Sequence, residues 1–298
     1  MREPNYHDLF FREMMAHPDA IADFIAYYLP AESAAALDAA SAELLPGTFV
    51  DEKLREHRSD LIYRVRMKAG GMAHIYLILE HKSYVYELVC WQVMRYSNQT
   101  WEQDLKNGGT TLTPILPVVF YHGAKPWTVE TTFSSLFDWQ GREWLKPYTP
   151  EFRFHLCDLA KFRDEELKGG LRLRLALLTM KHIFDRRLNI LWQRLIELFQ
   201  NTPERIGVNF LGTALRYIVG VRDAPVQEIE KVIEATFPKE KEAAMTTLTR
   251  QWFQEGVQQG IQQGIQQGIQ QGQHEATYKL ALKLLSNRFG ALNESAQA

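Results

Sequence analysis

Hydrophobic residues recur every three or four positions between residues 6 and 28, a spacing that predicts two consecutive helices. His17-Pro18 interrupts the pattern, and Pro18 suits the first turn of the second helix. Pro30 ends that helix, and the Ala-rich stretch that follows, closed by Pro46-Gly47, is expected to be a short helix or an ordered loop. The spaced apolar residues are Leu9, Phe10, Met14, Ile21, Phe24, Ile25 and Tyr28.

Residues 61 to 82 predict a β-hairpin. Apolar and polar residues alternate from Leu61 to Lys68, as expected of a strand with one wet face. The turn falls at "KAGG", where Gly70 and Gly71 can adopt positive φ. The following "HIYLILEHK" is a denser apolar run, as expected of an inner strand. We therefore expect a hairpin centred near residue 70.

The predicted hairpin would gather two carboxylates and an ammonium group at one end. Folding the chain back about residue 70 places Asp60 roughly opposite Glu80. Glu80 and Lys82 share one face of their strand, while His81 faces the other way. Paired carboxylates suit a hard cation such as Mg²⁺, which takes few protein ligands and leaves room for phosphate oxygens and water. A solvated strand end is the alternative, but Glu80 follows a very apolar strand, where a charge is costly without a partner or a task.

The next segment, residues 84–106, predicts an amphipathic helix. Leu88, Trp91 and Arg95 form one stripe along it. Gln92 and Tyr96 are four residues apart and so lie one above the other. If this helix packs against the hairpin, an amide and a hydroxyl could both face the predicted metal site.

Later segments complete a mixed α/β core. The stretch "LTPILPVVFYHG" predicts a buried strand with its prolines confined to the beginning, residues 152–160 predict a further strand, and residues 165–199 are strongly helical. His122, at the end of the first of these strands, is expected to be a hydrogen-bonded turn residue rather than a ligand. Five basic residues in the helical segment either contact phosphate or form a solvated helix face: Arg172, Arg174, Lys181, Arg186 and Arg187.

These features together resemble a known nuclease superfamily. Asp60, Glu80-x-Lys82 at the end of a hydrophobic strand and Gln92-xxx-Tyr96 on the next helix resemble the PD-(D/E)XK core. The proline that names the motif is absent, since Arg58-Ser59 precedes Asp60. More specifically, "YHDLFFREMM", "LILEHKS", "QVMRY" and "LTPILPVVFYHGAKPW" resemble the recombination-promoting nucleases, also called YhgA-like transposases, over roughly residues 5 to 200.

The resemblance implies a restriction-endonuclease-like fold and a metal-dependent DNA endonuclease. Asp60 and Glu80 would be ligands of Mg²⁺, with Mn²⁺ or Ca²⁺ as other candidate ions, and the backbone carbonyl of His81 would complete the metal shell. Lys82 would position or activate water, and Gln92 and Tyr96 would orient Lys82 or contact DNA.

The opening helix could add a metal ligand or serve as scaffold, with Asp8 and Glu13 as the candidates. An exposed acid at a helix start, interacting with the helix dipole, is the favoured interpretation of Asp8.

The C-terminal third carries no cluster of chemically active residues. Residues 203–252 predict helices separated at "NTPERIG", "RDAPVQEIE" and "TFPKE". The repeat "GVQQGIQQGIQQGIQQGQ" then places glycine at every fourth position, and five helical glycines cost ~5 kcal/mol relative to alanine. We expect a marginal helix that orders on self-association, with a flexible Gly/Gln linker as the rival. The chain would thus comprise a nuclease domain (1–200), a helical domain (201–252) and an oligomerisation region (253–298).

Composition and charge narrow the functional class. With 46% hydrophobic and 23% charged residues, the chain is expected to be globular, and a net charge of −2 argues against a protein that binds DNA only as a polycation. Cys90 and Cys157 show no metal-ligand spacing and are expected to be buried free thiols. Neither a membrane span nor a signal-peptide core is visible, so we expect a cytoplasmic protein.

Three functions remain open at this point. The first is a DNA endonuclease. The second is a non-catalytic DNA-binding or adaptor protein that keeps the fold and self-associates through its C-terminal repeat. The third is a true transposase, but the three spaced acidic residues that strand transfer needs are not apparent.

Overall fold

The computed structural model describes residues 6–45, 61–80, 86–201, 208–222 and 224–236, with a few further residues between 238 and 249. The chain divides into two compact units, residues 1–241 and 242–298. Nearly all described residues belong to the first unit. Within the described ranges, no helix is both long and apolar enough to cross a membrane.

The N-terminal pattern folds as predicted. Helices α1 (Tyr6–Met15) and α2 (Pro18–Tyr28) are separate, and α2 begins at Pro18 after the extended residue His17. Proline is tolerated there because the first N–H groups of a helix have no partner within the helix. The Ala-rich stretch forms the short helix α3 (Ala31–Ala36) and then a 3-10 turn, η1 (Ala39–Ser41).

One mixed sheet holds five strands in the order β1-β2-β3-β4-β5. The strands β1, β2 and β3 are antiparallel, whereas β3, β4 and β5 run parallel. Both the predicted hairpin and the predicted later strands are confirmed, although the last strand is shorter than residues 152–160. The strands are β1 (Glu43–Leu44), β2 (Leu61–Arg66), β3 (Met72–Glu80), β4 (Ile115–Tyr121) and β5 (His155–Asp158).

The register of the hairpin is set by its turn. Gly70 and Gly71 both have positive φ, 98° and 83°, which L-residues with side chains rarely adopt. Leu61 consequently pairs with Leu77, and the hairpin is centred at residue 69. Glu80 therefore lies three residues beyond the partner of Leu61, at the far end of β3.

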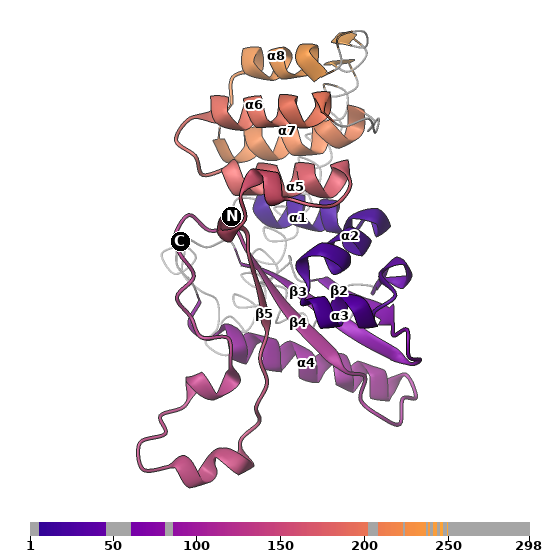
Figure 1. Ribbon diagram of the computed structural model, residues 1–298, viewed down its shortest axis with the longest axis vertical. Helices are drawn as coiled ribbons and strands as arrows, with labels where there is room; N and C mark the ends of the chain where they lie inside the picture. The colour runs from indigo at the N-terminus through magenta and orange to yellow at the C-terminus, as the bar shows by residue number, and fades with distance from the viewer. Residues whose placement is uncertain are drawn as a thin grey trace, which may run out of the picture. The chain divides into compact units, whose positions relative to one another are not determined.

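Helices cover both faces of the sheet (Figure 1). Helix α4 (Val89–Lys106) covers one face, where it closes an apolar cluster with side chains of β2, β3, β4 and η4. Helices α1 and α2 cover the other face, where Phe11 and Phe24 pack on Phe120 at ring distances of 5.2 and 6.1 Å, and α5 packs against these two helices. The α4-side cluster consists of Ile62, Tyr76, Ile78, Val89, Cys90, Val93, Tyr96, Val119, Phe133 and Phe154. Cys90 and Cys157 are both buried free thiols, as predicted.

The helical region continues after β5, as the sequence predicted. Helix α7 packs on α1, where the ring of Tyr217 stacks on Phe10 at 4.3 Å. A Cβ at Gly220 would come within 2.5 Å of the Tyr6 ring, so the close approach of these helices requires glycine there. The helices are α5 (Leu171–His182), α6 (Leu188–Gln200), α7 (Val208–Arg222) and α8 (Val226–Thr236).

A long connection joins β4 to β5. It contains two 3-10 helices, η4 (Phe133–Leu136) and η5 (Glu143–Tyr148). Figure 1 shows this segment reaching away from the sheet beyond α4. The hydrophobic pattern predicted no element here, because the 3-10 turns are too short to produce a helical repeat.

Candidate functional site

The carboxyl ends of three parallel strands meet at one edge of the sheet. Glu80, Tyr121 and Asp158 are the last residues of β3, β4 and β5 and are paired in register from strand to strand. Ligands of open α/β sheets bind outside the carboxyl ends of the strands. This edge is therefore where the fold would hold a ligand.

Among the predicted metal-site residues Asp60, Glu80, His81 and Lys82, only the backbone of Glu80 lies within the described part of the chain. Its position at the end of β3 is the one that the sequence predicted. Alternation along the strand assigns position 80 to the face of Tyr76 and Ile78, which α4 covers. Asp60, His81, Lys82 and the side chain of Glu80 lie outside the described residues.

Gln92 and Tyr96 both turn from α4 toward the sheet. They are 8% and 3% exposed, and the ring of Tyr96 lies 5.3 Å from that of Tyr76. Near the other end of α4, Asp104 lies 3.7 Å from His74 at the start of β3, so the helix runs back along the strand. Gln92, one turn before Tyr96, is therefore the nearer of the two to the carboxyl end of β3.

Asp158 is a buried carboxylate at the same edge, and the sequence analysis missed it. It is 5% exposed, and its Oδ1 accepts a hydrogen bond from the backbone N–H of Ala160 at 3.1 Å. Alternation along β5 places it on the same face as Phe154. An acid closing an apolar strand, "HLCD", was the signal that could have identified it.

Tyr121, between Glu80 and Asp158 in this row, is held by the turn that follows β4. Its hydroxyl donates to the carbonyl of Lys125 at 2.6 Å, and its ring meets Trp127 edge-on at 5.1 Å. A Cβ at Gly123 would lie 2.2 Å from the Tyr121 hydroxyl. Glycine at 123 therefore lets the tyrosine fold back over its own turn.

A buried ring cluster lies on the opposite face of this edge. His7 at the start of α1 lies 5.2 Å from the His122 ring, and its Nδ1 is 2.7 Å from the Tyr217 hydroxyl. Burial lowers the pKa of His7 to about 4. His122 is 3% exposed and its Nδ1 lies 3.3 Å from the Met180 carbonyl, so the expectation of a hydrogen-bonded histidine is confirmed.

The two acids of α1 have different environments. Asp8 is buried at 9% exposure, so the expectation of an exposed acid at the helix start is wrong. The first turn of α1 is packed against other elements, since the neighbouring His7 contacts the rings of His122 and Tyr217. Glu13 accepts a hydrogen bond from Thr213 at 2.6 Å and pairs with Arg216, which makes it a link between α1 and α7.

Comparison with known proteins assigns the chain to a family. A sequence model of the family described as "Putative transposase, YhgA-like" matches residues 5–206. The chain belongs to this YhgA-like family. The predicted resemblance is thereby confirmed.

Relatives within the YhgA-like family carry two kinds of name. Recombination-promoting nuclease RpnA of Escherichia coli (strain K12) is 30% identical over 251 residues, which cover 82% of each chain. Recombination-promoting nuclease RpnC of the same strain is 28% identical over 200 residues, 64% of this chain and 63% of the relative. Inactive recombination-promoting nuclease-like protein RpnE, also of strain K12, is 28% identical over 251 residues, 82% of this chain and 80% of the relative. No solved structure matches.

The YhgA-like family thus includes proteins named as nucleases and proteins named as inactive. Family membership supports nuclease and recombination chemistry at the level of the family. The mixed sheet with helices on both faces is consistent with a restriction-endonuclease-like fold.

The acidic residues at this edge of the sheet are of the type that binds a hard cation. Carboxylate oxygens are the ligands that Mg²⁺ takes from proteins. Asp158 supplies one buried carboxylate there, and position 80 is a glutamate. Among the described residues alone, no group of three or more His, Cys, Asp and Glu could hold a metal ion. The residues flanking this edge in sequence would have to complete such a site.

His7 should make stability depend on pH in the acid range. Its pKa is about 4 in the folded protein and about 6.5 in an unfolded chain, so the unfolded state binds more protons between these values. The free energy of unfolding should therefore be highest above pH 6.5 and fall by about 3 kcal/mol as the pH drops to 4. Urea unfolding across this range checks the prediction.

The variant His7→Gln should show a shallower slope of unfolding free energy against pH. His74 should leave part of the slope in place, since burial lowers its pKa as well, against the opposing effect of Asp104. An unchanged slope in the variant would contradict the role assigned to His7.

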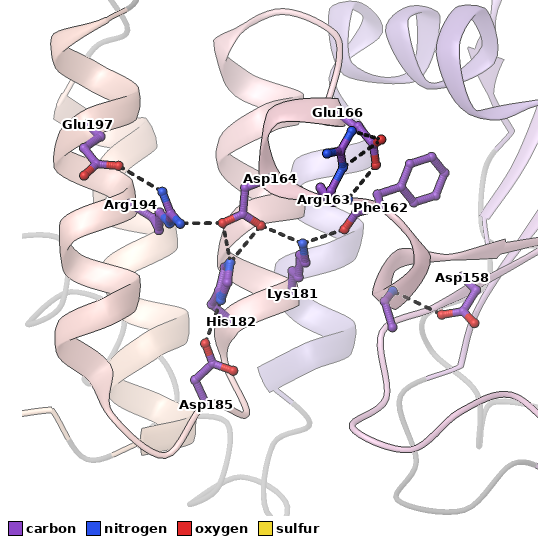
Figure 2. Close-up of polar contacts among 11 residues, drawn as sticks. Asp158, Phe162, Arg163, Asp164, Glu166, Lys181, His182, Asp185, Arg194 and Glu197 are labelled. Atoms are coloured by element: carbon purple, nitrogen blue, oxygen red, sulfur yellow. Dashed lines mark hydrogen bonds and ion pairs between the residues drawn. The ribbon is translucent and has the colours of Figure 1, made fainter.

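A network of charged side chains joins α5 and α6 to residues 162–164, in the segment that follows β5 (Figure 2). Asp164, 12% exposed, lies 2.6 Å from the Nζ of Lys181, 2.9 Å from the Nε2 of His182 and 3.1 Å from the Nε of Arg194. The other ring nitrogen of His182 lies 2.6 Å from Asp185. Burial opposes ionisation of Asp164, but hydrogen bonds from Lys181 and His182 outweigh it and lower the pKa of this carboxyl.

The contacts of the five basic residues between positions 172 and 187 show which of them lie on a solvated face. Lys181 bonds to Asp164 and to the carbonyl of Phe162 at 2.6 Å, so it is an internal residue rather than a solvated one. Arg172 pairs with Asp19 at 3.1 Å and covers the Phe210 ring at 4.2 Å. Arg186 and Arg187 are exposed, as the solvated face would have them.

Replacing Asp164 by asparagine should destabilise the protein by about 3 kcal/mol, because Lys181 and Arg194 would lose their shared carboxylate. The matched control is Glu43→Gln, which breaks the exposed ion pair with Arg64 and should cost less than about 1 kcal/mol. Chemical unfolding measures both variants. Equal losses in the two variants would show that the Asp164 network contributes no more than a surface pair.

Proposed function

We propose that the protein is a Mg²⁺-dependent DNA endonuclease that promotes recombination by hydrolysing phosphodiester bonds. The observation that carries the proposal is the position of Glu80, the last residue of an inner strand, in a row with Tyr121 and Asp158 at the carboxyl edge of the sheet. The Gln92 side of α4 approaches the same end of β3. The names of the relatives support nuclease chemistry as the use of this edge.

In this proposal each residue has a separate task. Asp60, Glu80 and the carbonyl of His81 hold the ion, which when bound lowers the pKa of a water molecule and offsets phosphate charge. Lys82 orients the attacking water and places a positive charge near the phosphate. Gln92 is the better placed of the α4 pair to orient Lys82, because Tyr96 packs in the core beside Tyr76.

Removal of divalent metal tests the proposed reaction. The full-length protein should nick or linearise supercoiled plasmid in Mg²⁺ and show no cleavage in excess EDTA, with activity restored by added Mg²⁺ or Mn²⁺. Gel electrophoresis of the plasmid gives the rate. Cleavage that persists at full rate in EDTA would refute metal dependence.

A non-catalytic DNA-binding or adaptor protein is the second candidate. The observation that favours it is the relative named inactive, which aligns with 82% of this chain. Such a protein would bind DNA in a mobility-shift assay and leave plasmid intact in every divalent metal. The plasmid experiment therefore separates the two functions.

The domain division and the assembly state belong to the same proposal. The repeat and residues 253–298 lie outside the described residues, and we assign them to self-association. Light scattering of the chain with and without residues 253–298 tests this, since an unchanged mass would favour the linker interpretation. A cytoplasmic location completes the proposal.

A further inference from the structure

The connection between β4 and β5 exposes two aromatic rings at its tip. Trp144 and Tyr148 are 69% and 81% exposed, the largest values among the exposed large hydrophobic residues in the described part of the chain. Both belong to η5, and Lys146 lies between them in sequence. Both rings are therefore accessible to a binding partner.

The fold of the tip does not depend on these two rings. The indole N–H of Trp139 donates to the carbonyl of Ser134 at 2.8 Å, and Arg142 pairs with Asp138 at 2.7 Å. The hydroxyl of Thr149 donates to the carbonyl of Leu145 at 3.1 Å. Local bonds of this kind fix η5 while leaving Trp144 and Tyr148 available to a partner.

A line of aromatic contacts joins the connection to the α4-side cluster. Phe133 packs in the α4-side cluster beside the first turn of α4. The ring of Phe137 meets Phe133 at 5.6 Å, Trp139 meets Phe137 at 5.2 Å, and the Nζ of Lys146 lies 5.5 Å from the Trp139 ring. The connection itself leaves the sheet directly after Tyr121, the neighbour of Glu80.

We propose that this tip binds single-stranded or locally unpaired DNA, with bases stacked on Trp144 and Tyr148 and a phosphate near Lys146. The inference rests on the proposed nuclease function and specifies its substrate class. Two exposed rings on a short helix that also carries a lysine suit nucleobases, because every base has a face that can stack and each is linked to a phosphate. The bases of an intact duplex are already stacked on one another, so the tip favours DNA in which they are free.

Binding to labelled oligonucleotides in EDTA tests this without requiring cleavage. Fluorescence anisotropy would compare a fluorescein-labelled oligo-dT with a duplex of equal length, using the full-length protein. Trp144→Ala and Tyr148→Ala should each weaken oligo-dT binding by about ten-fold and leave duplex binding unchanged. Lys146→Ala should lower the salt dependence by about 0.7 in log–log slope.

Two further variants serve as controls. Tyr27→Ala removes another exposed ring, 51% exposed, from α2 and should bind oligo-dT as the wild type does. Trp144→Phe should retain most of the affinity, because it keeps a stacking face.

The inference is overturned if the wild type does not bind oligo-dT, if the alanine variants bind it normally, or if they weaken duplex binding equally. It is also overturned if they lower the oligomer mass without changing DNA affinity, which would make the tip a protein interface. Failure here is distinguishable from failure of the nuclease proposal, because plasmid cleavage in Mg²⁺ is measured separately from binding in EDTA.

Discussion

Glu80→Gln should reduce Mg²⁺-dependent plasmid cleavage by at least about a thousand-fold, equivalent to about 4 kcal/mol of transition-state stabilisation. Glutamine has the same shape but no negative charge, so it would weaken the hold on the ion at the carboxyl edge of the sheet. Position 80 is the last residue of β3, so the change should leave the apolar cluster beneath it intact. Cleavage rates at saturating Mg²⁺, together with circular dichroism, measure both effects.

The matched control for this variant is Glu87→Gln. Glu87 is an exposed acid just before α4 and has no part in the proposed site. It should cleave as the wild type does. If Glu80→Gln is as active as Glu87→Gln, position 80 does not hold the metal and the assigned site is wrong.

Lys82→Met should lower the rate constant for cleavage by about a hundred-fold while leaving metal affinity close to that of the wild type. Methionine removes the charge and the N–H donors that would orient water but keeps much of the side-chain length. The predicted separation of rate from metal affinity distinguishes an orienting residue from a ligand. Single-turnover cleavage and calorimetric titration with Mn²⁺ measure the two quantities.

Lys106→Met, at the end of α4, is the control for loss of a positive charge. Lys106 is exposed and far along the helix from Gln92. It should have little effect on either quantity. A Lys82→Met variant that loses Mn²⁺ binding together with activity would show that Lys82 supports the metal site rather than the water.

The periodic parts of the fold were predictable from the sequence. The alternation from Leu61 to Arg66 and the paired glycines at 70 and 71 are local signals, and both appear in the structure as predicted. The spacing of Gln92 and Tyr96 likewise gave their shared face, because helical period is a property of the chain itself. Local regularity of this kind needs no knowledge of distant partners.

Features that depend on tertiary contacts could not be predicted in the same way. Asp8 is buried in a first turn of α1 where the neighbouring His7 packs against His122 and Tyr217, and no local pattern reports those contacts. In the sequence Lys181 is one of several basic residues and resembles a surface cation. Its bond to Asp164, 17 residues earlier, becomes visible only in the folded structure.

The candidate site was predictable only in part. The sequence identified Glu80 at the end of its strand, and the structure places it there. Asp158 lies beside Tyr121 and near Glu80 because β3, β4 and β5 are parallel neighbours. The order of strands in a sheet cannot be predicted from the sequence of any one strand. The exposure of Trp144 and Tyr148 could not be predicted from the sequence either, since tryptophan and tyrosine are usually at least partly buried.

In the proposed site, Asp60 and Glu80 hold one divalent ion at the carboxyl end of β3. The most direct measurement is the anomalous difference density of a crystal of the full-length protein soaked in Mn²⁺. We expect a single strong peak between the carboxylates of Asp60 and Glu80, within coordination distance of the His81 carbonyl. Manganese bound elsewhere, or no peak at this edge in crystals of protein that cleaves DNA, would contradict it.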